Sequence, residues 1–265
     1  MNQQAVGFFD SGWGGLSILR ATRQHLPYED FIYVADCGNA PYGDQTHDFI
    51  VDRALKISDF LFQEQKVKAM VVACNTATVE SIRTLREKYP ERIILGVEPA
   101  IKPAVNFSKK HCIGMISTYR TAHSERYQEL LKAFAQNTRV ISKGCPGLME
   151  CVEAGQLCTS ETIKLLHNYL DPMIEADIDA LVLGCTHYPF LIPAIQTIVG
   201  KDVALFEPGL AVAKHLKHQL DLQNTLTESK APGKDTFYVS DLNEKRKKVA
   251  RSLYPLATCF FELPH

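Results

Sequence analysis

The sequence contains no Cys-x-x-Cys pair, although eight of its 265 residues are cysteine. Zinc ribbons and zinc fingers use that spacing, so the cysteines predict no metal site. Every apolar run is shorter than the ~20 residues that a membrane-spanning helix needs. The opening stretch, MNQQAVGFFDSGWGG, carries neither the basic segment nor the apolar stretch of a secretory signal. We therefore expect a cytoplasmic protein with reduced cysteines and no membrane partner.

A strong charge imbalance is also missing. The 29 basic residues nearly balance the 30 acidic ones, which gives a formal net charge of −1. A basic excess is the usual electrostatic sign of nucleic-acid binding, so no nucleic-acid partner is predicted. Hydrophobic residues make up 46% of the chain and charged residues 22%, as in ordinary globular proteins. The length predicts one or two domains with a sizeable core.

Short apolar runs alternate with amphipathic stretches along most of the chain. This alternation predicts parallel sheets in α/β layers. We expect strands at residues 5–10, 30–36, 67–74, 92–98, 111–118, 138–144, 178–185, 202–207 and 236–241. We expect helices at residues 14–26, 47–65, 76–89, 124–135 and 211–222, two more between 144 and 178, one after 185, and a basic one after 241.

Two of the apolar runs end in similar ways. VVACNTATVE contains Cys74, and LVLGCTHYPF contains Cys185 at the matching position. Ligands of open α/β sheets bind at the carboxyl ends of strands, where both cysteines are predicted to lie. A thiol at the start of a helix is expected to have a pKa below its ordinary ~8.5. The repeat therefore predicts two similar α/β domains with parallel-type sheets that face each other across a cleft, each contributing one thiol. The predicted boundaries are 1–97 plus 208–265 for the first domain and 98–207 for the second.

A glycine-rich turn follows the first predicted strand. Gly12, Gly14 and Ser17 form a truncated dinucleotide fingerprint, and Asp36 closes the next strand at a suitable distance. A nucleotide-binding oxidoreductase is therefore one alternative, although a serine replaces the third glycine and Asp10 would place a carboxylate beside a phosphate. The turn equally suits a small carboxylate held by backbone N–H groups. Asp10 could be catalytic or a helix cap.

Six motifs, taken together and in order, identify a family. FDSGWGGLS, ADCGNAPYGDQT, VVACNTAT, EPAIKPA, CPGLMECVE and LVLGCTHYPFL resemble the bacterial glutamate racemases of the aspartate/glutamate racemase superfamily. The motifs extend over nearly the whole chain except its tail. The pair ACNTA and GCTHYP is specific for the superfamily, and DSGxGG together with PYG points to the glutamate racemases within it.

The resemblance implies interconversion of L- and D-glutamate without a cofactor, which supplies D-glutamate for peptidoglycan, by a protein that works as a homodimer. It implies that Cys74 takes the α-proton from the D-enantiomer and Cys185 from the L-enantiomer, and that Asp10 and His187 assist these thiols. Two opposed groups, one protonated and one not, meet the chemical requirement of racemisation. The residues implied to hold the substrate are Ser11, Pro41, Tyr42, Gly43, Asn75, Thr76, Thr118, Thr121, Glu150 and Thr186.

The sequence departs from the family pattern at three places. Glu98 replaces an apolar residue near the predicted domain crossover, where we expect it to be solvated. Gly147 replaces a bulkier residue and is expected to loosen local packing, and the loop Cys37–Asn39 also varies. Two further alternatives are an aspartate racemase, against which the PYG loop argues, and a non-enzymatic binding protein that keeps the fold.

Overall fold

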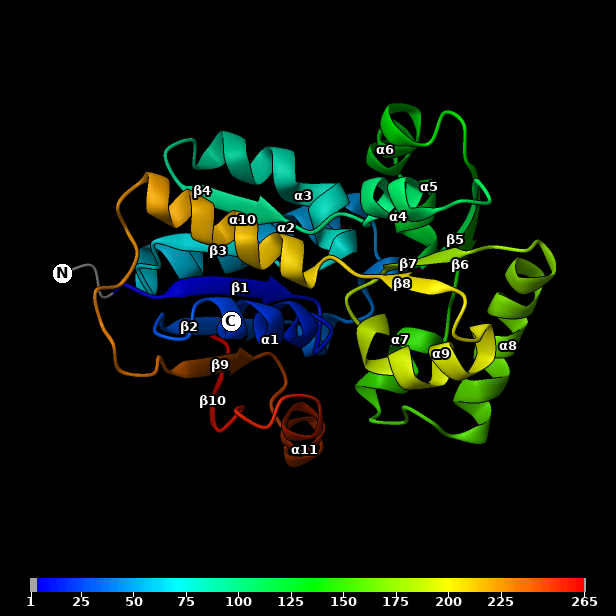
Figure 1. Ribbon diagram of the computed structural model, residues 1–265. Coiled ribbons are helices and arrows are strands. Elements are labelled where there is room, and N and C mark those ends of the chain that lie inside the picture. Colours follow the sequence, from blue (N-terminus) through cyan, green and yellow to red (C-terminus); the bar gives the residue numbers. More distant parts are fainter. Residues whose placement is uncertain (1–3, 265) are drawn as a thin grey trace.

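The computed structural model describes residues 4–264, and residues 1–3 and 265 of the predicted first domain lie outside them. The chain folds around two sheets, and all strand pairs of the described residues are parallel (Figure 1). The larger sheet has six strands in the order β10-β9-β2-β1-β3-β4, and the smaller has four in the order β6-β5-β7-β8. The predicted fold class is confirmed, although the two sheets differ in size.

The six-stranded sheet is built from both ends of the chain. Its strands are β1 (Val6–Asp10), β2 (Phe31–Ala35), β3 (Ala69–Val72), β4 (Ile93–Gly96), β9 (Asp235–Val239) and β10 (Cys259–Glu262). Its helices are α1 (Leu16–His25), α2 (His47–Asp59), α3 (Asn75–Lys88), α10 (Gly209–Leu222) and α11 (Glu244–Leu253), with short turns at Cys37–Asn39, Tyr42–Asp44 and Phe60–Glu64. We call this sheet and its helices the first lobe.

Helices cover both faces of this sheet, so its central strands are apolar throughout. All of β1 is buried, and alternate side chains point to opposite faces. Val6 and Phe8 join the core cluster that contains Leu16 of α1, whereas Phe9 joins the cluster that contains Ile50 of α2. This arrangement explains why the strands read as continuous apolar runs in the sequence.

The four-stranded sheet and its helices form the second lobe. Its strands are β5 (Cys112–Ser117), β6 (Arg139–Gly144), β7 (Ala180–Gly184) and β8 (Ala204–Phe206). Its helices are α4 (Ile101–Phe107), α5 (Tyr119–His123), α6 (Glu125–Phe134), α7 (Leu148–Glu153), α8 (Ser160–Glu175) and α9 (Ile192–Val199), with a 3-10 turn at Tyr188–Leu191. Most predicted elements are present, but α4, α5 and β10 were not predicted.

The chain passes from the first lobe to the second between β4 and α4, and it returns between β8 and α10, which packs against α1 (Figure 1). These crossings lie near the predicted domain boundaries at 97/98 and 207/208. The division into domains at these residues remains a prediction. No helix of residues 4–264 has the length and apolar character needed to span a membrane.

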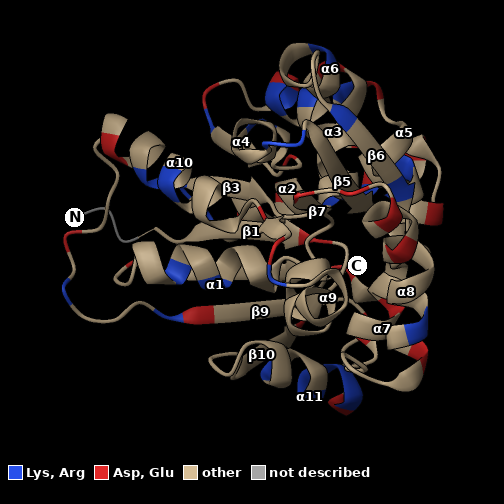
Figure 2. Cartoon of the chain, turned by 45° about the vertical axis from the view of Figure 1, so that its right-hand side comes forward, with Lys and Arg blue, Asp and Glu red and all other residues tan. Residues whose placement is uncertain are grey.

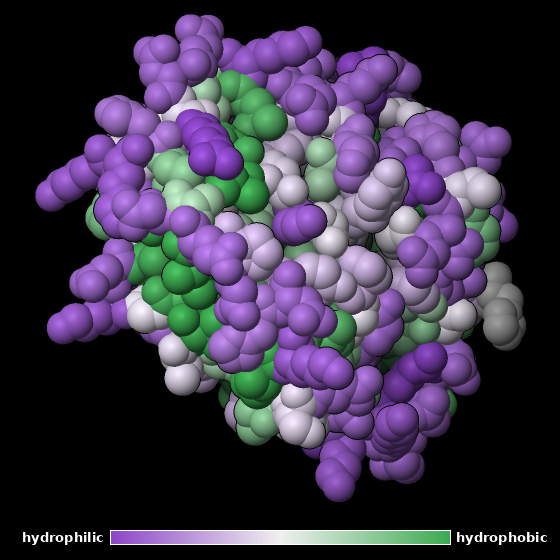
Figure 3. Space-filling model, turned by 90° about the vertical axis from the view of Figure 1, so that its right-hand side faces the viewer, coloured by the Kyte–Doolittle hydropathy of each residue, from purple (hydrophilic) through white to green (hydrophobic). Residues whose placement is uncertain are grey.

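The surface is charged and mixed in sign. Basic and acidic residues both occur on the outer helices, for example on α6 and α11 (Figure 2). Hydrophilic residues also cover most of the end of the molecule formed by the second lobe, where hydrophobic residues gather in a few patches (Figure 3). The apolar surface of the sheets is therefore buried largely between helices and sheets.

Candidate active site

A cavity opens between the two lobes, where the carboxyl ends of strands from both sheets meet. It is lined by Ser11, Pro41, Tyr42, Gly43, Asp44, Cys74, Asn75, Thr76, Thr118, Tyr119, Cys145, Pro146, Met149, Glu150, Cys185, Thr186, His187 and Tyr188. The structure thus brings together all the predicted site residues except Asp10 and Thr121, which lie directly behind this lining. Because Cys74 follows β3 of one lobe and Cys185 follows β7 of the other, each lobe contributes one thiol to a shared space.

Cys74 occupies the N-cap position of α3. Its sulfur accepts a hydrogen bond from the backbone N–H of Ala77 at 3.4 Å and lies 3.6 Å from the hydroxyl of Ser11. Nevertheless, burial and, secondarily, the charge of Asp10 raise the pKa of Cys74 to about 12, and both hydrogen bonds offset this only in part. The prediction of a lowered pKa is therefore wrong for this thiol, since loss of water outweighs the helix N-terminus.

Cys185 has a different partner. Its sulfur lies 3.6 Å from Nδ1 of His187, and Nε2 of the same ring lies 2.7 Å from a carboxylate oxygen of Glu153. Burial alone would lower the pKa of His187, but the hydrogen bonds to Cys185 and Glu153 raise it well above its usual value. A cationic ring in this place can donate hydrogen bonds to both neighbours. The helical segment after Cys185 begins only at Tyr188, as a 3-10 turn. Cys185 therefore does not cap a helix as Cys74 does.

Asp10 is fully buried at the end of β1. Its carboxylate accepts hydrogen bonds from the backbone N–H of Gly12 at 2.9 Å and from the hydroxyl of Thr186 at 3.3 Å. Burial raises the pKa of Asp10, while the charge of His187 and the N–H of Gly12 oppose that shift. Asp10 is not the helix cap, because the N-cap residue of α1 is Gly15, and the charge of Asp10 acts on Cys74.

A side chain of the same protein occupies the space beside the glycine-rich turn. The backbone N–H of Trp13 donates a hydrogen bond of 2.5 Å to Glu153 of the second lobe. A Cβ added at Gly12 would lie 2.2 Å from Oε1 of Glu153, and one added at Gly14 would lie 2.3 Å from Nδ1 of His187. A carboxylate therefore fills the space that a pyrophosphate would need, which argues against the nucleotide-binding alternative.

The predicted substrate-binding residues contact one another and the lobe opposite. Thr76 of α3 and Thr118, which caps α5, share a hydrogen bond of 3.0 Å across the cleft, and Thr118 also donates to the buried Thr121. The Tyr42 hydroxyl donates to Asp36, whose carboxylate also receives two bonds from Arg53. This network fixes the loop that carries Pro41 to Gly43 against the first lobe.

Asn75 leaves an acceptor free at the cavity. Its side-chain amide donates to the backbone carbonyl of Val97 at 3.2 Å, whereas its Oδ1 is buried and has no hydrogen-bond partner among residues 4–264. A buried amide oxygen of this kind is suited to accept a hydrogen bond from a bound ammonium group.

Sequence reasoning missed Glu153 and Cys145. Glu153 lies in the CPGLMECVE motif, and its position three residues after Glu150 on one helical turn is a signal that could have found it. Cys145 is a third thiol in the cavity lining, and burial raises its pKa to about 12. Tyr119, Met149 and Asp44 also line the cavity without having been predicted.

Two of the sequence departures now have a physical explanation. Glu98 lies outside the cavity lining and forms an ion pair with Arg126 at 2.7 Å, with 36% of its side chain exposed. Gly147 has a φ of 90° at the start of α7, a left-handed conformation that favours glycine. This backbone conformation accounts for the glycine, and the expectation that Gly147 loosens local packing stays a prediction.

The chain resembles known racemases along its length. The model of the Asp/Glu/Hydantoin racemase family matches residues 16–216. The glutamate racemase of Pseudomonas syringae pv. tomato is 44% identical over 235 residues, which cover 89% of this chain and 84% of the relative. The structure of the Francisella tularensis glutamate racemase, in complex with D-glutamate, has a TM-score of 0.85 at 30% identity, with 100% of this chain and 97% of that chain covered.

A third comparison agrees. The Escherichia coli glutamate racemase, solved in complex with L-glutamate and the activator UDP-MurNAc-ala, has a TM-score of 0.86 at 26% identity, with 99% of this chain and 100% of that chain covered. This chain therefore belongs to the Asp/Glu/Hydantoin racemase family. The expectation of an enzyme of the amino-acid racemase class is confirmed, and the resemblance to glutamate racemases extends through both lobes.

Proposed function

We propose that this protein interconverts L- and D-glutamate through two thiols that act on opposite faces of the α-carbon. The observation that supports this most is that Cys74 and Cys185 reach one cavity from facing lobes. The curated relatives are named glutamate racemases, and the solved relatives bind D- or L-glutamate. Acid and base are both needed in each turnover, and the contrasting surroundings of the two thiols provide them.

In the L-to-D direction, the thiolate of Cys185 takes the α-proton, and the pair of electrons left behind spreads into the carboxylate. The thiol of Cys74 then delivers its own proton to the other face, which leaves a thiolate there. The buried carboxylate of Asp10 keeps Cys74 protonated for this delivery. The reverse reaction uses the same two groups with their roles exchanged.

The remaining lining orients the amino acid. The free Oδ1 of Asn75 accepts a hydrogen bond from the ammonium group, and Glu150 adds negative charge on the same cavity wall. Backbone N–H groups at the start of α3 are available to the α-carboxylate as charge develops on it. Ser11, Thr76, Thr118 and Thr186 add hydroxyl groups to the cavity lining, and the Pro41–Gly43 loop closes one side of the cavity.

Incubating the purified protein with L-glutamate alone tests this proposal. The optical rotation should decay to zero as the two enantiomers reach equal concentrations, and a parallel incubation with L-aspartate should decay far more slowly. Decay with aspartate but not glutamate would favour the aspartate racemase alternative. A constant rotation with both amino acids would leave the non-enzymatic binding protein as the better hypothesis.

We also propose that the reaction needs neither metal nor pyridoxal phosphate and that it supplies D-glutamate for peptidoglycan in the cytoplasm. The two thiols already provide acid and base. Exhaustive dialysis against a chelator should leave the activity unchanged, and activity restored by an added cofactor would contradict the two-thiol scheme. We further propose a homodimer, as the family resemblance implies, which light scattering on the purified protein tests.

A further inference from the structure

One group of polar contacts between the lobes is formed by residues 10–17, which include the glycine-rich turn after β1. Trp13 of this turn donates its backbone N–H to Glu153, Ser17 donates its hydroxyl to the backbone carbonyl of Thr186 at 2.8 Å, and Thr186 donates to Asp10. In each pair one residue belongs to the first lobe and the other to the second. This part of the first lobe therefore contacts the segment of the second lobe that carries Cys185.

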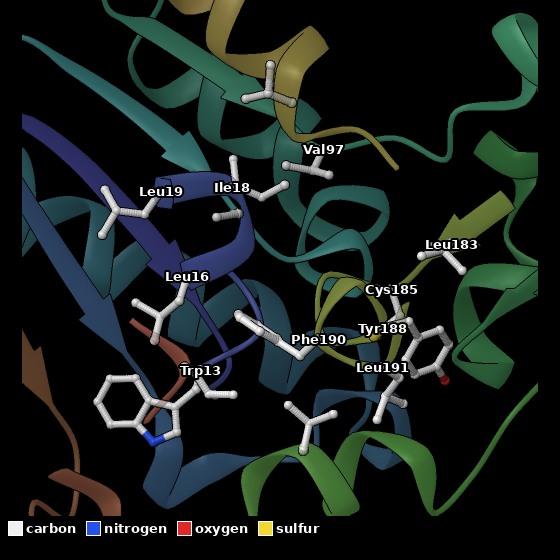
Figure 4. Packing of buried hydrophobic residues seen from close by; sticks show 14 of the residues in the cluster. Trp13, Leu16, Ile18, Leu19, Val97, Leu183, Cys185, Tyr188, Phe190 and Leu191 are labelled. Carbon is white, nitrogen blue, oxygen red and sulfur yellow. The ribbon is translucent and has the colours of Figure 1, made fainter. Parts of the chain in front are cut away.

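An apolar contact supports these bonds. One core cluster contains Trp13 and Leu16 from the first lobe together with Phe190 and Leu191 from the second, and Figure 4 shows it extending past Cys185. Arg20 of α1 also lies over the ring of Phe190 at 5.5 Å. The start of α1 and the turn after β7 are thus packed as a unit.

The two glycines of the turn are explained by this packing. Among residues 4–264, the glycines with positive φ are Gly147, Gly155 and Gly200, so the backbone conformation does not require glycine at 12 or 14. Close approach does require it, because a Cβ at Gly12 would meet the carboxylate of Glu153 and one at Gly14 would meet the ring of His187.

We propose that the Gly12–Gly14 turn is a positioning element for the thiol of the opposite lobe. The backbone of the turn binds the carboxylate of Glu153. Because Gly14 has no side chain, the His187 ring can pack closely against the turn and stay beside Cys185. Glu153 and the turn are positioning residues, since they act through His187 and do not touch the cavity in which the substrate reacts. Cys185, His187 and Glu153 all belong to the second lobe, and the turn of the first lobe holds the carboxylate of Glu153 in place. This inference rests on the proposed two-thiol function.

Selective alkylation tests the proposal without depending on turnover. Wild type, Gly12→Ala and Gly14→Ala are treated with iodoacetamide, and labelling at Cys185 and Cys74 is followed by mass spectrometry of the two peptides. Displacing His187 takes its ring away from the sulfur of Cys185, so labelling there should fall about tenfold relative to Cys74. Cys74 is the internal control in the same molecule.

Two further variants keep the test decisive. Glu153→Gln preserves the shape of the carboxylate and removes its charge, so it should lower the same ratio by a few-fold even if the alanine variants fold poorly. Gly38→Ala places a Cβ 3.2 Å from side chains of Ser240 and Asp241, away from His187, and should leave the ratio unchanged. An unchanged ratio in Gly14→Ala and Glu153→Gln, or an equal loss at both thiols, would overturn the proposal. If the wild type failed to racemise glutamate while the variants still altered the ratio, only the proposed function would be overturned.

Discussion

The two thiols occupy matching positions in the sequence but unlike surroundings in the structure. Cys74 caps a helix beside the buried carboxylate of Asp10, which favours its neutral form. Cys185 lies beside His187, whose raised pKa favours a cation. A repeated strand-and-cysteine pattern thus gives similar positions, while the neighbouring side chains give each thiol different partners. In the proposed mechanism, Cys185 is the base for L-glutamate and Cys74 is the acid on the opposite face.

Removing either thiol should have the largest effect. Cys74→Ser and Cys185→Ser each replace an acid–base group by a hydroxyl that rarely ionises, so racemisation should fall by about 10³-fold or more in both directions. Polarimetry measures the loss. In deuterated water, proton NMR should still detect slow exchange of L-glutamate by the Cys74 variant and of D-glutamate by the Cys185 variant. Early deuterium in the starting pool of the wild type would instead indicate a single base.

Replacing the partners of the thiols should have a smaller effect and should separate them. His187→Asn removes the cation beside Cys185, and we expect kcat/KM to fall about 10²-fold. The isotope effect with α-deuterated L-glutamate should increase, because proton removal by Cys185 becomes slower relative to the other steps. Asp10→Asn should instead make Cys74 easier to ionise. If both variants changed both isotope effects alike, the two thiols would not have separate partners.

The pH dependence of alkylation should show the difference between the thiols directly. A thiol with a pKa raised to about 12 is neutral at lower pH, and its thiolate fraction grows as the pH rises toward that value. Labelling of Cys74 by iodoacetamide should therefore increase about tenfold per pH unit from pH 7 to 10. Cys185, which has His187 beside its sulfur, should be labelled faster than Cys74 at pH 7. A plateau for Cys74 below pH 9 would show that its thiol ionises far more easily in solution.

Weakening the lobe contact on the side of Cys74 should have the smallest effect. Arg120 of α5 pairs with Glu80 of α3 at 3.2 Å, with 29% and 13% of their side chains exposed. Such a pair contributes at most about 1 kcal/mol, so Arg120→Ala should raise KM by about two- to five-fold. Lys110→Ala removes an exposed pair within the second lobe and should leave KM unchanged. An effect of equal size in both variants would rule out a role for the cross-lobe pair.

Most of the fold could be predicted because buried parallel strands are apolar along their whole length. The element β10 escaped prediction, since this edge strand is short and its residues are mostly exposed. Helix α5 has only five residues, too few for a periodic pattern. Helix α4 carries Pro103 near its start and was not distinguished from the linker before it.

The sequence predicted most of the residues that line the site, but it did not predict how the fold shifts their pKa values. Motifs placed both thiols and most lining residues, because these follow strands at the same edge of each sheet. The high pKa of Cys74 depends on burial by both lobes, which no local pattern contains. The bond between Trp13 and Glu153 likewise joins residues far apart in the chain, so the glycine-rich turn alone did not reveal what fills it.

The unpaired Oδ1 of Asn75 has a consequence for handedness. A buried acceptor without a donor costs about 1–3 kcal/mol, and a bound ammonium group removes that cost. L- and D-glutamate carry the same ammonium group, and mirror images have equal free energies in water. A contact to that group therefore strengthens binding of both enantiomers without selecting either. In the proposed mechanism, Asn75 holds a group that both enantiomers share, and the two sulfur atoms act on opposite faces of the α-carbon.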